Sequence, residues 1–97
     1  MDLLFDGSRF YMGPDPRNPL AEITFTRDGT RHLIIEHTIT DPSLRGQGIG
    51  RKLVERVAEY ARENGFKLLS HCSYARHVLS GPEFDDVYIG QKDARAE

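Results

Sequence analysis

Hydrophobic and polar residues alternate in the first third of the chain. Within residues 20–26, the apolar Ala21, Ile23 and Phe25 are separated by polar residues. A period of two predicts a strand with one buried face, because successive side chains of a strand point to opposite sides. Residues 8–12 carry aromatic and β-favouring side chains and predict an earlier strand.

Turn signals separate these strands from a longer one. The segment 13–19 contains three prolines, which exclude a helix and an inner strand there. An Asp-Gly pair at 28–29 is a strong hairpin signal and precedes a strand at 31–40. The apolar run 33–35 inside that strand is continuous, so we expect both of its faces to be covered. This order predicts three antiparallel strands at the start of the chain.

A period near 3.6 residues replaces the alternation after the glycine-rich segment 46–50. The apolar stripe of this pattern consists of Ile49, Leu53, Val54, Val57, Ala58 and Ala61. Charged residues fill the other side, which is typical of an amphipathic helix. Asn64-Gly65 is a left-handed stop signal, so the helix is expected to run through about Glu63.

The remainder of the chain predicts a short strand at 66–72 and a short helix at 74–79. Residues 86–89 fit either a last strand or a packed tail, and 91–97 a flexible tail. A right-handed crossover through the long helix would make the strands before and after it parallel. We therefore expect one α+β domain over residues 1–97, in which a mixed sheet combines a three-strand antiparallel meander with a βαβ unit.

Composition narrows the function classes. The chain has 97 residues and a net charge of −2, which excludes a strongly basic nucleic-acid binder. Cys72 is the single cysteine, so an intramolecular disulfide and a multi-cysteine zinc site are excluded. The first residues lack a signal-peptide pattern, and no apolar run approaches the roughly 18 residues of a membrane span. We expect a cytoplasmic protein with no nucleic-acid or membrane partner.

The segment Gly46-Gln47-Gly48-Ile49-Gly50 carries the sharpest chemical signal. Glycines allow backbone N–H groups to converge on an anion, and a helix N-terminus adds partial positive charge. Arg45, Arg51 and Lys52 add charge nearby. The segment fits neither the dinucleotide pattern nor the P-loop pattern. Its interpretation from spacing alone stays divided between a phosphate cradle and a plain glycine-rich turn.

Arg45-x-x-Gly48-x-Gly50 resembles the R/Q-x-x-G-x-G/A signature of the GCN5-related N-acetyltransferases (GNAT). The chain from about Arg9 to Val87 is similar to the minimal, roughly hundred-residue YjdJ-type family of this superfamily. The stretches that carry this likeness are Arg9-Phe10-Tyr11, Ala21-Glu22-Ile23, His37-Thr38, Leu44 to Gly50, Tyr60-Ala61-Arg62, Cys72-Ser73-Tyr74 and Pro82-Glu83-Phe84. The resemblance implies a truncated GNAT fold that binds acetyl-CoA or coenzyme A as co-substrate.

The resemblance also implies where each part of the cofactor lies. The pyrophosphate would bind the segment Arg45, Gly46, Gln47, Gly48, Ile49, Gly50, Arg51 and Lys52. The acetyl arm would lie between the strands 31–40 and 67–72, where a backbone N–H near Thr38, Ile39 or Thr40 would donate to the thioester oxygen. Relatives commonly have an acidic residue soon after the His-Thr pair, whereas this chain has Ile39-Thr40.

Cys72, His37 and Tyr74 are the candidate catalytic residues. Cys72 would accept the acetyl group or protonate the leaving thiolate, with His37 beside it on the neighbouring strand. A small buried hydrophobe is the alternative for the cysteine, and a packed strand residue the alternative for the histidine. His71 is expected to point away from Cys72, because neighbouring strand residues face opposite sides. For the same reason, only one of Glu36 and His37 faces the acetyl group unless a bulge intervenes.

Tyr74 would donate its hydroxyl proton to the sulfur of coenzyme A, or else merely pack. Three interpretations of the whole chain remain. The first is an acetyltransferase that passes the acetyl group to an amine, through Cys72 in one version. The second is a non-catalytic coenzyme A-binding or regulatory module, and the third a scaffold whose glycine loop binds nothing. A proline-rich loop replaces the helices that shape the acceptor site in larger relatives, so the acceptor groove is expected to be reduced or supplied by a partner chain in a homo-oligomer.

Overall fold

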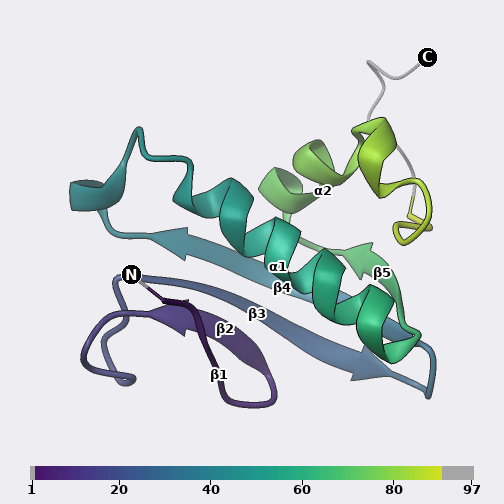
Figure 1. Ribbon diagram of the computed structural model, residues 1–97, viewed down its shortest axis with the longest axis horizontal. Coiled ribbons are helices and arrows are strands. Elements are labelled where there is room, and N and C mark those ends of the chain that lie inside the picture. Colours follow the sequence, from purple (N-terminus) through teal and green to yellow (C-terminus); the bar gives the residue numbers. More distant parts are fainter. Residues whose placement is uncertain (1, 91–97) are drawn as a thin grey trace.

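The computed structural model describes residues 2–90, which form one five-stranded sheet and two helices (Figure 1). The strands are β1 (Leu4–Phe5), β2 (Arg9–Met12), β3 (Ala21–Asp28), β4 (His32–Thr40) and β5 (Lys67–Ser70). The helices are α1 (Ile49–Asn64) and α2 (Ser73–Leu79), and single 3₁₀ turns occur at η1 (Pro42–Leu44) and η2 (Pro82–Phe84). The predicted tail 91–97 lies outside the described residues.

The strands follow one another across the sheet in chain order. The pairs from β1 to β4 are antiparallel, and β4 pairs with β5 in parallel through the α1 crossover. The predicted α+β fold with a meander and a βαβ unit is confirmed, and β1 adds a fourth antiparallel strand to the meander. No helix within residues 2–90 is long and apolar enough to cross a bilayer.

Both helices pack on one face of the sheet, which we call the helix-covered face. The strand side chains buried there are Phe10, Met12, Ala21, Ile23, Phe25, Leu33, Ile35 and Leu68. The other face, called the open face, carries the alternate residues, such as Thr24 and Ile34. Ile34 is only half-buried, so the expectation that both faces of 33–35 are covered is wrong. The physical reason is that the described residues cover a single face of the sheet.

The helix α1 ends as its sequence predicts. Gly65 has φ 75° and its N–H donates to the Ala61 carbonyl, a left-handed stop that a residue with a side chain would adopt only with strain. The side chains of Leu53, Val54, Val57, Ala58 and Ala61 are completely buried against the sheet. The apolar stripe of the helix therefore forms the side of the hydrophobic core that faces the sheet.

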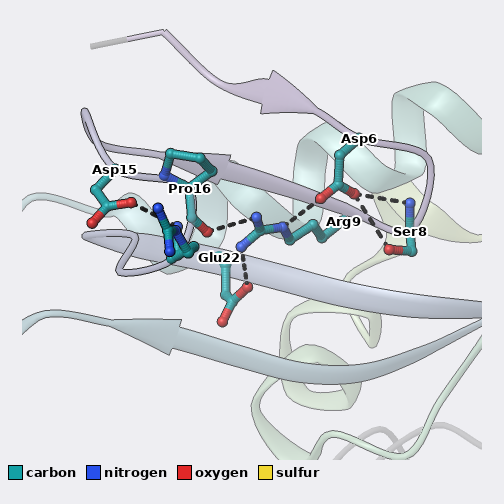
Figure 2. Close-up of polar contacts among 7 residues, drawn as sticks. Asp6, Ser8, Arg9, Asp15, Pro16 and Glu22 are labelled. Carbon is teal, nitrogen blue, oxygen red and sulfur yellow. Dashed lines mark hydrogen bonds and ion pairs between the residues drawn. The ribbon is translucent and has the colours of Figure 1, made fainter.

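Arg9 fastens the first strands together on the open face (Figure 2). Its guanidinium donates to Asp6 at 2.7 Å, to Glu22 at 3.0 Å and to the Pro16 carbonyl at 2.7 Å. These contacts join the turn before β2, the proline-rich loop and β3. On this face, which α1 and α2 do not cover, polar contacts therefore hold the strands and loops together.

The segment after α2 is a packed tail with one isolated bridge. The Leu68 N–H donates to the Val87 carbonyl at 2.8 Å, and the Ile89 N–H donates back to Leu68 at 3.1 Å. Arg62 of α1 also pairs with Asp86 at 2.7 Å. Of the two forms that the sequence allows for 86–89, the packed tail is therefore the closer one.

Candidate functional site

The strand β4 contains a bulge in its middle. Thr24 of β3 pairs with His37, whereas the next residue, Phe25, pairs with Ile35, so Glu36 is an extra residue in β4. Glu36 and His37 therefore both lie on the open face. Beyond the bulge, Thr38 pairs with the buried Ile23 and returns to the helix-covered face.

The strands β4 and β5 part just beyond this bulge. Their last pair is Ile35 with Ser70, followed by a bond of 2.8 Å from the His71 N–H to the Ile35 carbonyl. The Ser70 hydroxyl accepts from the Cys72 N–H at 3.0 Å and donates to the Cys72 carbonyl at 2.9 Å. This local turn ends β5 at Ser70, so the strand is shorter than the predicted 66–72, and Cys72 is the N-cap of α2. Within the part of the chain that the structure describes, residues 36–40 consequently have no strand partner on the β5 side, and we call this opening the splay.

A cleft of about 520 Å³ lies on the helix-covered face beside the splay. It is lined by Thr38, Thr40, Leu44, Arg45, Gly46, Gly48, Ile49, Gly50 and Tyr74. The cleft therefore joins the second half of β4, the first turn of α1 and the first turn of α2.

The first turn of α1 opens onto this cleft without a side-chain cap. Gly48 is the N-cap residue with φ 71°, and Gly46 precedes it with φ 80°. The N–H groups of Ile49, Gly50 and Arg51 have no acceptor within the helix, because the first turn of any α-helix leaves its donors unpaired. Such donors, together with the helix dipole, favour an anion. The glycine-rich segment therefore presents unpaired backbone donors to the cleft, as an anion cradle would require.

Gly50 has a role different from the one its motif suggests. It is the second residue of α1, and a Cβ placed on it would lie 3.0 Å from the Tyr74 hydroxyl oxygen. The missing side chain thus lets Tyr74 lie against the start of α1. The hydroxyl of Tyr74 consequently borders the cleft.

The three predicted cations are placed differently. Arg45 lines the cleft. Arg51 pairs with Glu55 at 3.0 Å and with Glu83 at 2.6 Å, and these bonds raise the pKa of its guanidinium. Lys52 lines a second cavity of about 850 Å³ with Gln47, between α1 and the N-terminal segment. Among residues 2–90, Arg45 alone adds a charge to the wall of the cleft itself.

The thiol of Cys72 faces the splay on the helix-covered side. It is partly buried, and Sγ lies 3.5 Å from the Thr38 hydroxyl. The structure thus places Thr38, rather than His37, next to Cys72. His37 is exposed on the open face because the bulge turns it there.

On the open face, His71 lies across the splay from β4. Its Nδ1 is 2.9 Å from a carboxylate oxygen of Glu36, and the second oxygen accepts from the Thr26 hydroxyl at 2.8 Å. The bonds from Thr26 and His71 lower the pKa of Glu36. His71 points away from Cys72, as predicted, but its pairing with Glu36 depends on the packing of β5 beside β4 and has no signal in the local sequence.

The site thus combines two parallel strands that part with a helix N-terminus that has no side-chain cap. The sequence profile described as GCN5-related N-acetyl-transferase matches residues 9–87. A GCN5-like putative N-acetyltransferase from Staphylococcus aureus, solved by NMR, is 38% identical, with 96% of this chain and 92% of that chain covered and a TM-score of 0.80. The chain therefore belongs to the GCN5-related N-acetyltransferase family, whose activity is acetyl transfer from acetyl-CoA.

Two larger proteins of similar fold share only part of their length with this chain. A nourseothricin acetyltransferase is 31% identical over 62% of this chain and 36% of its own, with a TM-score of 0.50. Rv2747 from Mycobacterium tuberculosis, solved in complex with CoA and NLQ, is 20% identical over 65% of this chain and 40% of its own, with a TM-score of 0.53, and shows the fold alone. The comparison with curated proteins finds no relative.

Proposed function

We propose that the chain binds acetyl-CoA in the cleft and transfers the acetyl group to an amine. The pyrophosphate would lie on the backbone amides of Gln47 to Arg51, because the Lys52 N–H already donates to the Gly48 carbonyl at 3.1 Å. The observation that carries this proposal is the uncapped N-terminus of α1, which opens onto the cleft with glycine at its N-cap. An anion at this position would pair donors that otherwise have no acceptor in the helix.

The acyl arm would run from this cradle toward the splay. A backbone N–H of residues 38–40 would donate to the thioester oxygen, and such a donor stabilises the negative charge that develops there during attack. Tyr74, whose hydroxyl borders the cleft, would supply a proton to the departing thiolate. Cys72 lies on the same side of the splay and is the proposed acyl acceptor if transfer takes two steps.

A second candidate function, a coenzyme A-binding module without turnover, is favoured by one observation. Within the described residues, the lining of the cleft contains no carboxylate and no imidazole that would take a proton from the amine. The acceptor-side base would then have to come from outside the cleft.

Calorimetric titration with acetyl-CoA tests the binding site. The variant Gly48→Val should weaken affinity at least about tenfold, on the order of 1.4 kcal/mol. A β-branched residue at positive φ strains the loop and displaces the amides. Tyr74→Phe, which keeps the ring and removes the hydroxyl, should leave affinity unchanged and slow turnover.

Gly29→Val is the matched control. Gly29 has φ 70° and Gly48 has φ 71°, and a Cβ at either position would meet no atom within 4 Å. Both variants should therefore lose similar stability, whereas only Gly48→Val should lose affinity. Equal affinity of the two folded variants for acetyl-CoA would refute the proposed cradle.

A further inference from the structure

We propose that His71, held by Glu36 and Thr26, removes the proton from the acceptor amine on the open face of the sheet. This inference rests on the proposed function and assigns its missing base. The acetyl group and the acceptor would then meet through the splay from opposite faces of the sheet.

The position of His71 supports this assignment. Its N–H forms the last bond between β5 and β4, so the residue stands at the point where the splay begins. Its side chain is 67% exposed, which leaves the ring accessible to an acceptor. The next residue, Cys72, lies on the other face against Thr38. His71 and Cys72 therefore flank the same opening from its two sides.

The hydrogen bonds around His71 set its chemistry. Glu36 stays ionised near neutral pH, because its pKa is lowered by Thr26 and His71, and an ionised carboxylate only accepts hydrogen bonds. Nδ1 of His71 must therefore be the donor in the 2.9 Å contact. In the neutral ring, Nε2 is then the unprotonated nitrogen, and it is the atom that would accept a proton. Glu36 and Thr26 act as positioning residues.

The proton balance follows from the reaction. An acceptor ammonium loses two protons overall when it becomes an amide. One passes to Nε2 of His71 and from there to water, so the neutral nitrogen attacks the carbonyl carbon. The new C–N bond forms as the C–S bond breaks, and the second proton ends on the sulfur of coenzyme A through the Tyr74 hydroxyl.

Two probe amines distinguish a base from a structural residue. Ethylamine is protonated at neutral pH and needs a base, whereas hydroxylamine is already unprotonated. With acetyl-CoA as donor, His71→Ala should slow enzyme-dependent thiol release with ethylamine on the order of 10²-fold, the usual contribution of a general base. The rate with hydroxylamine should change less than about twofold, and free imidazole should restore part of the ethylamine rate. Glu36→Gln should change the rates in the same direction by a smaller factor.

His32→Ala is the control, because His32 is the first residue of β4 and lies at the end of that strand opposite the splay. Acetyl-CoA affinity should be unchanged in all three variants. An equal loss with both amines, no loss with either, or no ethylamine turnover by a wild-type protein that binds acetyl-CoA would overturn the assignment. Absence of acetyl-CoA binding would instead refute the proposed function.

Discussion

The two halves of β4 differ in strand pairing and in burial. Residues 32–35 are paired on both sides, and Leu33 and Ile35 are buried beneath α1. Residues 37–40 pair with β3 and, within residues 2–90, with no strand on their other side, and Ile39 is 56% exposed. One strand thus carries the core in its first half and the proposed reaction site in its second. The change occurs at the Glu36 bulge, which shows how one extra residue reassigns the faces of a strand.

Removal of the Cys72 thiol should have the largest effect and tests the proposed reaction site at the second half of β4. Incubation with acetyl-CoA should add one acetyl group to the protein, and Cys72→Ala should abolish the adduct, because the thiol faces the splay beside Thr38. Intact-protein mass spectrometry measures the adduct. The variant should still bind acetyl-CoA by calorimetry. An adduct that persists in the variant, or none in the wild type, would contradict the two-step route.

Truncation of Ile35 tests the first half. Ile35 is completely buried, so Ile35→Ala should lower the free energy of unfolding by about 2–5 kcal/mol. Ile39→Ala, four residues along the same strand, should change it by less than about 0.5 kcal/mol because its side chain is exposed. Urea unfolding measures both. Similar losses of unfolding free energy in the two variants would contradict the proposed division of β4 into a core half and a site half.

Removal of Arg45 tests the positive charge in the cleft beside the second half of β4. Arg45→Ala should weaken acetyl-CoA binding by a few-fold, and added salt should shrink this loss, since exposed charges are screened. Arg51→Ala should have the smaller effect, because Arg51 is already paired with Glu55 and Glu83. Titrations at two salt concentrations distinguish them. A larger loss from Arg51→Ala would mean that it leaves its partners to bind the ligand.

Acidification tests the Glu36 bulge, where the two halves of β4 meet, and should have the smallest effect on stability. The folded pKa of Glu36 is lowered from 4.5, so the stability it contributes is present above 4.5 and is lost as pH falls through the folded value. Thr26→Val should raise this pKa by removing a hydrogen bond to the carboxylate. NMR titration of the Glu36 carboxyl group measures the shift. The stability change should stay below about 1 kcal/mol, and an unshifted titration would show that the bond contributes nothing.

Much of this fold follows from local sequence patterns. Alternation at 20–26 and the stripe of α1 produce the elements that they predict, because each pattern reflects a single buried face. The Asp-Gly turn forms because Gly29 adopts a positive φ without strain. Gly46 and Gly48 have positive φ, a backbone conformation that glycine adopts without strain.

The remaining features depend on contacts between distant residues. The Glu36 bulge is fixed by the register with β3, and that register decides that Thr38 rather than His37 reaches Cys72. The pairing of Glu36 with His71 joins residues on two strands that meet only after the crossover. The contact between Gly50 and Tyr74 requires α2 to pack beside α1. No pattern within a short window reports such contacts.

The order of the strands has a consequence for how the chain folds. Because the strands are neighbours in chain order, the β2–β4 meander closes through short loops, and such local closure has a low entropic cost. The pairing of β5 with β4 spans the longest stretch of chain between neighbouring strands, because α1 lies between them. During synthesis from the N-terminus, the splay can therefore form only after the ribosome has released β5, which supplies its second wall. A nascent chain that stops at α1 contains most of the core but cannot yet form the site.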